Sequence, residues 1–246
     1  MAIVAVVFVV ILLGATLQRV SGMGVGLIAA PILAIAIGPV EGVLVVNVLA
    51  AMNATLTTFS VRKHVNWAKT ATIGSVMIVG SAAAAALILA ISAGLLQAIV
   101  GAMLIVALAV VTWGKNWFPP ARGTVAALGA GVASGFTNGL AGVAGPTLTV
   151  YAQASRWETR EFTATLQPLF VIAGLISAGM KLVMGASSLG NQSVWVWVAG
   201  LVAMLLGIGV GSRIAQHLSQ PAARKLALTV AAAGAVVALV RGLTML

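Results

Sequence analysis

Two stretches of this sequence could bind an anion through backbone N–H groups. They are residues 21–26 (SGMGVG) and residues 138–146 (NGLAGVAGP), and both interrupt long apolar runs. Glycine costs a helix about 1 kcal/mol and proline about 3 kcal/mol relative to alanine, so each stretch is expected to break a helix or reverse the chain. A helix that starts at such a break directs unpaired N–H groups and the positive end of its dipole at the space before it. That arrangement suits a bound anion.

Polar side chains near the two breaks could complete an anion site. Gln18 and Asn47 could donate hydrogen bonds, and Arg19 could neutralise the charge or equally extend to the membrane surface. The glycines could instead serve only to let helices pack closely. The occurrence of two similar breaks favours a binding site. The predicted substrate-binding residues are Gln18, Arg19, Ser21, Gly22, Gly24, Gly26, Asn47, Asn138, Gly139, Gly142, Gly145 and Gln167.

Residues for other kinds of chemistry are scarce. Cysteine and aspartate are absent, and the acids are Glu41, Glu158 and Glu161. Glu41 and Glu161 begin predicted helices, where a negative charge ordinarily stabilises the helix N-terminus. His64 and His217 lie in predicted loops without neighbouring carboxylates or thiols, so neither is expected to bind a metal. We therefore expect no enzyme activity, no metal and no cofactor.

The elements that carry these residues are predicted to be membrane helices. Of the 246 residues, 61% are hydrophobic and 7% are charged, whereas soluble domains carry about 25% charged residues. Apolar runs of roughly 18 or more residues span bilayers as helices, because lipid offers no partner for backbone polar groups. The predicted apolar segments are 2–20, 23–37, 42–60, 69–91, 93–113, 123–138, 140–153, 162–184, 193–211 and 222–245.

The basic residues predict the partner and the topology. The net charge of +10 lies mainly in short loops between apolar runs, which indicates a lipid bilayer and not a nucleic acid as the partner. If each broken pair of helices forms a hairpin, most basic residues share one face, whereas mere kinks would divide them almost evenly between two faces. The shared set is Arg62, Lys63, Lys69, Lys115, Arg122, Arg156, Arg160, Arg213, Arg224 and Lys225.

The hairpin arrangement therefore satisfies the positive-inside rule. It places the shared set in the cytoplasm, both termini outside, and only Lys181 and Arg241 on the outer side. Lys181 lies near the end of its segment and is expected to extend to the membrane surface. Hairpins that cross the membrane fully and hairpins that turn within it fit this distribution of basic residues equally well.

The hairpins also predict an internal repeat. An N-terminal repeat at 1–113 and a C-terminal repeat at 123–246 would have opposite orientations, joined by a cytoplasmic linker at 114–122. At an offset of 120, Gly22 falls on Gly142, Glu41 on Glu161 and Asn47 on Gln167. The predicted fold is an all-α integral membrane protein of two inverted repeats, each a glycine-broken helical hairpin plus three transmembrane helices. Secondary transporters with this architecture bind substrate near the membrane centre.

The sequence resembles the TauE/SafE family of sulfite and organosulfonate exporters, also called the toluene sulfonate uptake permease family. The residues that carry the resemblance are the break at 21–26, Pro31 after it, and the second break at 139–146. The usual family patterns are Gly-x-Gly-Gly-Gly and Gly-x-Gly-Gly-Pro. This chain departs from them at Val25 and Ala144, each of which replaces a glycine.

The resemblance implies export of a small sulfur-containing anion, such as sulfite or sulfoacetate, across a bacterial-type inner membrane, driven by an ion gradient. Alternating access of the two repeats is the expected mechanism. An anion channel of the same architecture and a non-transporting membrane scaffold or assembly protein remain as alternatives. The expected partners are the anion and the lipid bilayer, with a homo-oligomer possible.

Overall fold

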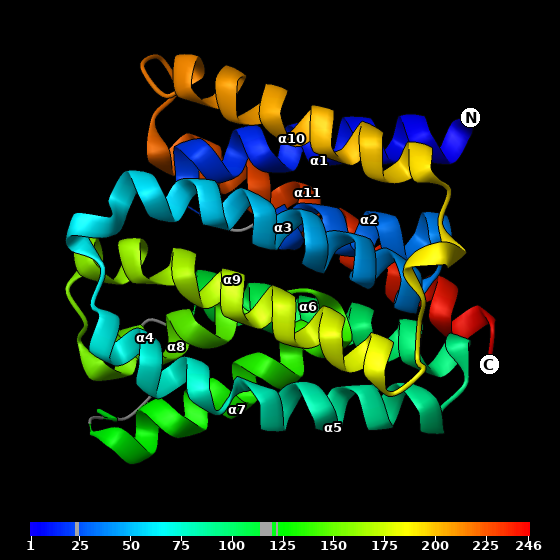
Figure 1. Cartoon of the computed structure of the whole chain (residues 1–246), viewed down its shortest axis with the longest axis horizontal. Helices are drawn as coiled ribbons and strands as arrows, with labels where there is room; N and C mark the ends of the chain where they lie inside the picture. The colour runs from blue at the N-terminus through cyan, green and yellow to red at the C-terminus, as the bar shows by residue number, and fades with distance from the viewer. Residues whose placement is uncertain (23–24, 114–119, 122) are drawn as a thin grey trace.

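The computed structural model describes residues 1–246 except 23–24, 114–119 and 122. The described residues form helices and connecting loops, with no strand among them (Figure 1). The α-helices are α1 (Ala2–Ser21), α2 (Val25–Ile37), α3 (Pro39–Val61), α4 (Trp67–Ser75), α5 (Met77–Ala90), α6 (Ala93–Trp113), α7 (Thr124–Ala141), α8 (Gly145–Ser155), α9 (Thr159–Val183), α10 (Val194–Ile214) and α11 (Gln220–Thr244). The short 3-10 helices are η1 (Arg62–His64) and η3 (Leu189–Asn191). The predicted all-helical fold class is confirmed.

Seven segments of the described chain are long and apolar enough to cross a membrane. They are α1, α3 with η1, α4 together with α5, α6, α9, α10 and α11. In contrast, α2 has 13 residues and α8 has 11. At about 1.5 Å per residue, neither covers the hydrocarbon thickness of about 30 Å. These two helices follow the predicted breaks and must begin or end within the membrane.

Each break reverses the chain direction, as the hairpin prediction requires. Gly22 and Gly142 end α1 and α7 in the left-handed conformation, with φ of 74° and 68°. This conformation favours glycine, because a side chain there would collide with the backbone. The start of α2 lies beside the middle of α1, since a Cβ on Gly14 would stand 3.1 Å from the Cγ1 atom of Val25. Both termini consequently lie at the same end of the molecule (Figure 1).

The helix boundaries repeat with the predicted spacing of 120 residues. The first helix of each half ends at Ser21 or Ala141, and the short helix that follows begins at Val25 or Gly145. Similarly, α3 is preceded by Gly38 and α9 by Glu158. These matches favour the prediction of two repeats.

The first helices of the two halves run in opposite directions. Successive contacts make α7 parallel to α5: Gly135 meets Met77, and Gly139 meets Ala84. In the same way α1 is parallel to α10, where Gly207 and then Gly211 meet successive turns of α1. Because α5 and α10 run in opposite directions (Figure 1), α1 and α7 are antiparallel. This is the geometry that inverted halves require.

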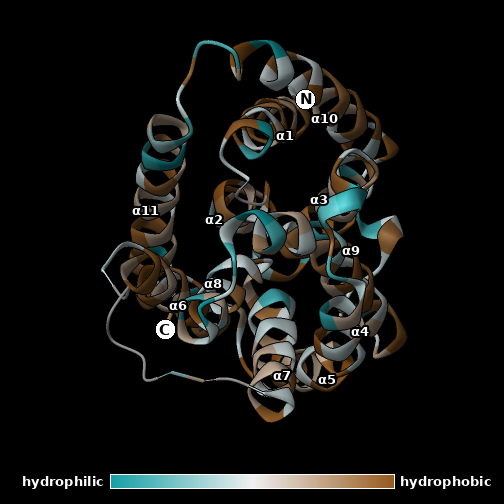
Figure 2. Cartoon of the chain, turned by 90° about the vertical axis from the view of Figure 1, so that its left-hand side faces the viewer, coloured by the Kyte–Doolittle hydropathy of each residue, from teal (hydrophilic) through white to brown (hydrophobic). Residues whose placement is uncertain are grey.

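The short helices lie at the centre of the bundle. Viewed along the helices from the end opposite the termini, α2 and α8 are enclosed by the longer helices (Figure 2). The outer helices expose large apolar side chains, such as Leu205 and Leu206 of α10 and Val236 and Val237 of α11. Such a surface matches lipid. The central helices are therefore shielded from the membrane.

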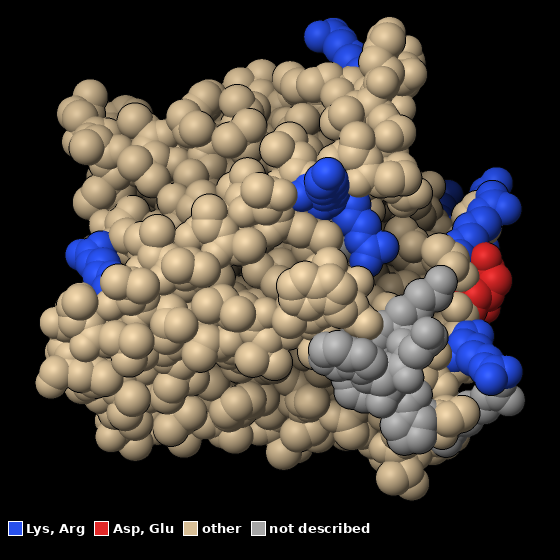
Figure 3. Space-filling view, turned by 180° about the vertical axis from the view of Figure 1, so that it is seen from behind, with Lys and Arg blue, Asp and Glu red and all other residues tan. Residues whose placement is uncertain are grey.

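Lys and Arg side chains gather towards the end opposite the termini (Figure 3). This end carries η1 and the turns between α8 and α9 and between α10 and α11. Lys115 and Arg122 of the predicted set lie outside the described residues. Lys181 does not extend to the surface as predicted: it is 1% exposed, and its ammonium donates to the carbonyl oxygen of Gly139 at 2.6 Å. That prediction was wrong because a polar carbonyl lies within reach inside the protein.

Candidate functional site

The two breaks meet at the centre of the molecule. Gly26, in the first turn of α2, packs directly on Gly142, where α7 ends. A Cβ atom on Gly26 would overlap the carbonyl oxygen of Gly142. A side chain on Gly142 would crowd Ala30 and Val46 and would also require a left-handed backbone. Glycine is therefore needed here for close approach of two backbones.

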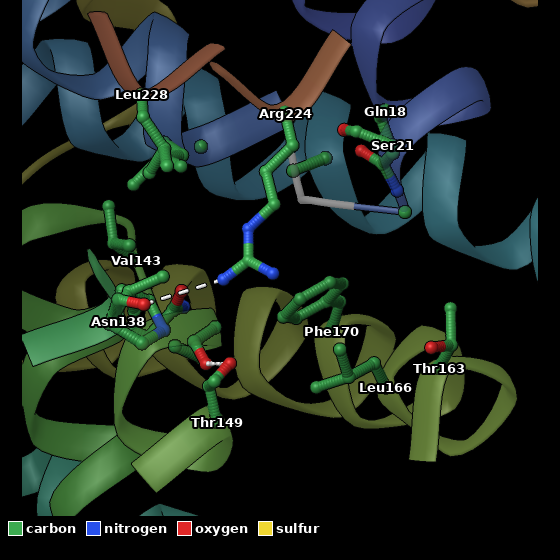
Figure 4. A pocket seen from close by; sticks show the side chains of 18 of the residues that line it. Gln18, Ser21, Asn138, Val143, Thr149, Thr163, Leu166, Phe170, Arg224 and Leu228 are labelled. Atoms are coloured by element: carbon green, nitrogen blue, oxygen red, sulfur yellow. Dashed lines mark hydrogen bonds between the residues drawn. The ribbon is translucent and has the colours of Figure 1, made fainter. Parts of the chain in front are cut away.

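A cavity of about 310 Å³ lies against this crossing. Its lining includes eight of the predicted residues: Gln18, Ser21, Gly22, Gly26, Asn47, Asn138, Gly142 and Gly145. The structure thus brings together residues from α1, α2, α3, α7 and α8 (Figure 4). None of the described lining residues is Asp or Glu.

The N-terminus of α2 is oriented by Gln18. The Gln18 side-chain oxygen accepts a hydrogen bond from the Val25 N–H at 2.6 Å, and its amide nitrogen donates to Gln167 Oε1 at 3.1 Å. One of the N–H groups that a helix leaves unpaired at its start is therefore satisfied by this side chain. The next residues of α2, Gly26 and Leu27, line the cavity. The positive end of the α2 dipole consequently faces it.

The N-terminus of α8 approaches the same cavity. Ala144 precedes this helix and offers no side-chain cap. Ala144, Gly145 and Pro146 all line the cavity, as does Thr149 one turn later. Two helix N-termini therefore converge on one space that is lined by no described carboxylate, and this arrangement favours negative charge there.

Asn47 supplies an unpaired hydrogen-bond donor at the cavity wall. Asn138 Nδ2 donates to Asn47 Oδ1 at 3.0 Å, and it also lies 3.0 Å from the Ala173 carbonyl oxygen and 3.1 Å from Ser177 Oγ. The Asn47 Nδ2 group has no partner among the described residues, although Asn47 is only 1% exposed. A buried donor without an acceptor costs free energy. An anion in the cavity would provide that acceptor.

Arg224 places a positive charge in the cavity. Its side chain projects from the start of α11 towards Asn138, Thr149 and Phe170 (Figure 4). One guanidinium nitrogen donates to the carbonyl oxygen of Val111 at 3.4 Å. It is the one Lys or Arg among the described lining residues. A guanidinium can hold an oxyanion by two parallel hydrogen bonds.

The chain also matches the model of a known protein family. The model of the sulfite exporter TauE/SafE family matches residues 6–238. The chain belongs to the sulfite exporter TauE/SafE family. No curated protein and no solved structure matches the chain. Membership in a membrane transporter family, together with the seven apolar helices, makes the chain a multi-pass membrane protein.

The cavity of this TauE/SafE family member is largely apolar away from the breaks. Its walls include Leu27, Val143, Leu166, Phe170 and Leu228. It also includes Thr159 and Gln220, the exposed first residues of α9 and α11. The cavity therefore reaches the surface at the basic end of the molecule. In the other direction, the Gly26–Gly142 contact and the Asn47–Asn138 hydrogen bond close it.

Four predicted residues of this TauE/SafE family member do not line the cavity. Arg19 is exposed and donates from Nε to Ser212 Oγ at 3.1 Å, and Gln167 lies behind Gln18. Gly139 packs against Ala84 and Ser81. Gly24 lies outside the described residues.

Arg224 was not predicted as a site residue. In the sequence it is one of several basic residues in a short connection, and no pattern distinguishes it from Lys225. Only the packing of α11 beside the breaks brings it to the cavity.

The acidic residues do not line the cavity. Glu41 accepts hydrogen bonds from Ser187 and Asn191, both at 2.8 Å.

Proposed function

We propose that this chain is a secondary transporter that exports a small sulfur-containing anion across the inner membrane by alternating access. Family membership supports the transporter class and the sulfur oxyanion. The observation that carries the proposal is the convergence of two helix N-termini, Arg224 and the unpaired Asn47 amide on one cavity. Each of these groups offers a hydrogen-bond donor or positive charge, and together they suit a sulfite or sulfonate group.

The size and walls of the cavity favour an organosulfonate over bare sulfite. A volume of about 310 Å³ exceeds that of a single oxyanion group. Small-molecule sites generally combine apolar walls with a few placed polar groups. A sulfonate group would bind between the breaks and Arg224, and a short organic tail such as that of sulfoacetate would contact Leu166 and Phe170. Sulfite would bind with part of the cavity still filled by water.

The closure of the cavity at one end supports alternating access over a permanently open channel. The cavity is open at the basic end, which the positive-inside rule leads us to expect in the cytoplasm. At the other end the paired glycines and paired asparagines separate it from the far side. Movement of one half against the other would separate these contacts and expose the site to the outside.

Flux measurements in proteoliposomes test this proposal. Vesicles loaded with radiolabelled sulfite or sulfoacetate should release label at a rate that saturates with concentration. Unlabelled substrate outside should accelerate release, because a carrier that returns loaded exchanges faster than one that returns empty. Flux that rises linearly with concentration and shows no such acceleration would indicate a channel. If neither anion moves faster than in protein-free vesicles, the proposed function is wrong.

A further inference from the structure

One face of α9 continues the cavity lining towards the far end of the molecule. Thr163, Leu166, Phe170 and Gly174 line the cavity and lie at helical spacings of three or four residues. The same face continues with Ser177 and Lys181. Residues at these spacings lie one above another on a helix. A single stripe therefore runs from the open end of the cavity to the region beyond its closed end.

Ser177 and Lys181 form a buried polar cluster with Ser81 of α5 beyond the closed end. Each is 1% exposed. The hydroxyl groups of Ser81 and Ser177 are 3.1 Å apart, and Ser177 Oγ also accepts a hydrogen bond from Asn138 of the cavity wall. Gly139, which accepts from Lys181, packs against Ser81. Hydrogen bonds and packing thus link the cavity to Lys181.

The Lys181 ammonium is only partly satisfied. It has three N–H donors, and the Gly139 carbonyl oxygen is its one hydrogen-bond acceptor among the described residues. No carboxylate lies within ion-pair distance of it in the described chain. α5 and α7, which pack against this part of α9, carry no charged residue, and α3 carries only Glu41, whose charge attracts the Lys181 ammonium without forming an ion pair with it. A buried ammonium without a paired charge is costly in a membrane protein and is generally functional.

We propose that Ser177 and Lys181 form a second binding station for the transported anion, on the far side of the break between α7 and α8. This inference rests on the proposed transport function. When the cavity is open at the basic end, Lys181 donates to Gly139 and helps to hold the end of α7 in place. When the far side opens, the free N–H groups of Lys181 and the Ser177 hydroxyl bind the sulfonate or sulfite oxygens. The anion is thereby transferred along the α9 face from Arg224 to Lys181.

Single-cysteine labelling tests whether Ser177 lines the pathway. The chain contains no cysteine, so Ser177→Cys introduces a unique thiol without altering Lys181. During exchange of sulfoacetate, a membrane-impermeant thiol reagent added on the side of the termini should label this thiol. Saturating sulfoacetate or sulfite should slow the labelling. Ser134→Cys is the matched control, because Ser134 is equally buried in α7 but does not lie on the α9 stripe; it should remain unlabelled.

Substitution of Lys181 tests its charge. Lys181→Gln should reduce sulfoacetate exchange by about tenfold or more, the effect of losing a charged hydrogen bond. The dissociation constant of the detergent-solubilised Lys181→Gln protein for sulfoacetate should stay within about threefold of wild type, because the cavity residues are unchanged. Lys181→Arg, which keeps the charge, should retain more exchange than Lys181→Gln. Arg241→Gln is the control, since it removes another basic side chain at this end without altering the α9 stripe.

The outcomes separate the second station from the transport function itself. Absence of exchange in the wild-type protein contradicts the proposed function. Wild-type exchange together with a Ser177→Cys thiol that the anion does not protect contradicts the second station alone. Wild-type rates in Lys181→Gln contradict it as well. Protection of the Ser177→Cys thiol by the anion, together with loss of exchange in Lys181→Gln while its binding of the anion in detergent remains, supports it.

Discussion

At the scale of single residues, Arg224 is expected to determine anion affinity. Its guanidinium is the described cation of the cavity, and charged hydrogen bonds contribute about 1.5–3 kcal/mol. Arg224→Gln should therefore weaken sulfite and sulfoacetate binding by roughly 10- to 100-fold. Isothermal titration of the detergent-solubilised protein measures this change. Lys225→Gln is the matched control, because Lys225 is exposed like Arg224 but does not line the cavity. Equal losses in both variants would contradict the assignment.

Some site residues could be predicted from the sequence and others could not. Glycine and amide residues within apolar runs were informative, because such residues are costly in a helix or in lipid unless they serve a structural or binding role. This reasoning located Gly26, Gly142 and Asn47. It could not separate Arg19 from Arg224, because both lie near helix ends, where a long side chain can turn outward or inward. The neighbouring helix determines the direction of the side chain, because Ser212 of α10 accepts a hydrogen bond from Arg19 and holds it away from the cavity.

At the scale of the helices, the contact between the two breaks is expected to be required for transport. Gly26→Ala places a methyl group against the Gly142 carbonyl oxygen, which belongs to the backbone and has little freedom to move. Overpacking of this kind costs about 1–3 kcal/mol and should lower the melting temperature as well as the rate of sulfoacetate exchange. Gly129→Ala on α7 is the control, since open space surrounds that position. Unchanged exchange in Gly26→Ala would show that α2 can shift without loss of function.

Most helices were predictable from apolar length, whereas only some of their ends were. The predicted segments at 93–113 and 23–37 end where α6 and α2 end. The second break was predicted within residues 138–146 and is found there, but the preceding apolar segment was predicted to end at residue 138, whereas α7 continues to Ala141 because Gly142 is the residue that adopts the left-handed cap. Several glycines in this stretch could have formed the left-handed cap, and the sequence does not distinguish them. Tertiary packing against Ala30 and Val46 selects one.

At the scale of the whole molecule, the charge distribution predicts orientation in the membrane. The basic end of the bundle, where the cavity opens, should face the cytoplasm, and both termini should lie outside. Single cysteines test this directly in intact cells. Leu189→Cys, in the exposed loop at the end of the termini, should react with a membrane-impermeant maleimide. Gln216→Cys, between α10 and α11, should react only after the cells are permeabilised.

Orientation determines what the conformation described here can do. With the basic end in the cytoplasm, the open cavity would be the loading state of the proposed exporter, and Arg224 would be the charge that a cytoplasmic anion meets inside the cavity. The cysteine-free parent chain should give no label in either condition, which makes any signal attributable to the introduced thiol. Labelling of Gln216→Cys and not of Leu189→Cys in intact cells would reverse the orientation. The same cavity would then face outward, and its donors would capture an external anion for uptake.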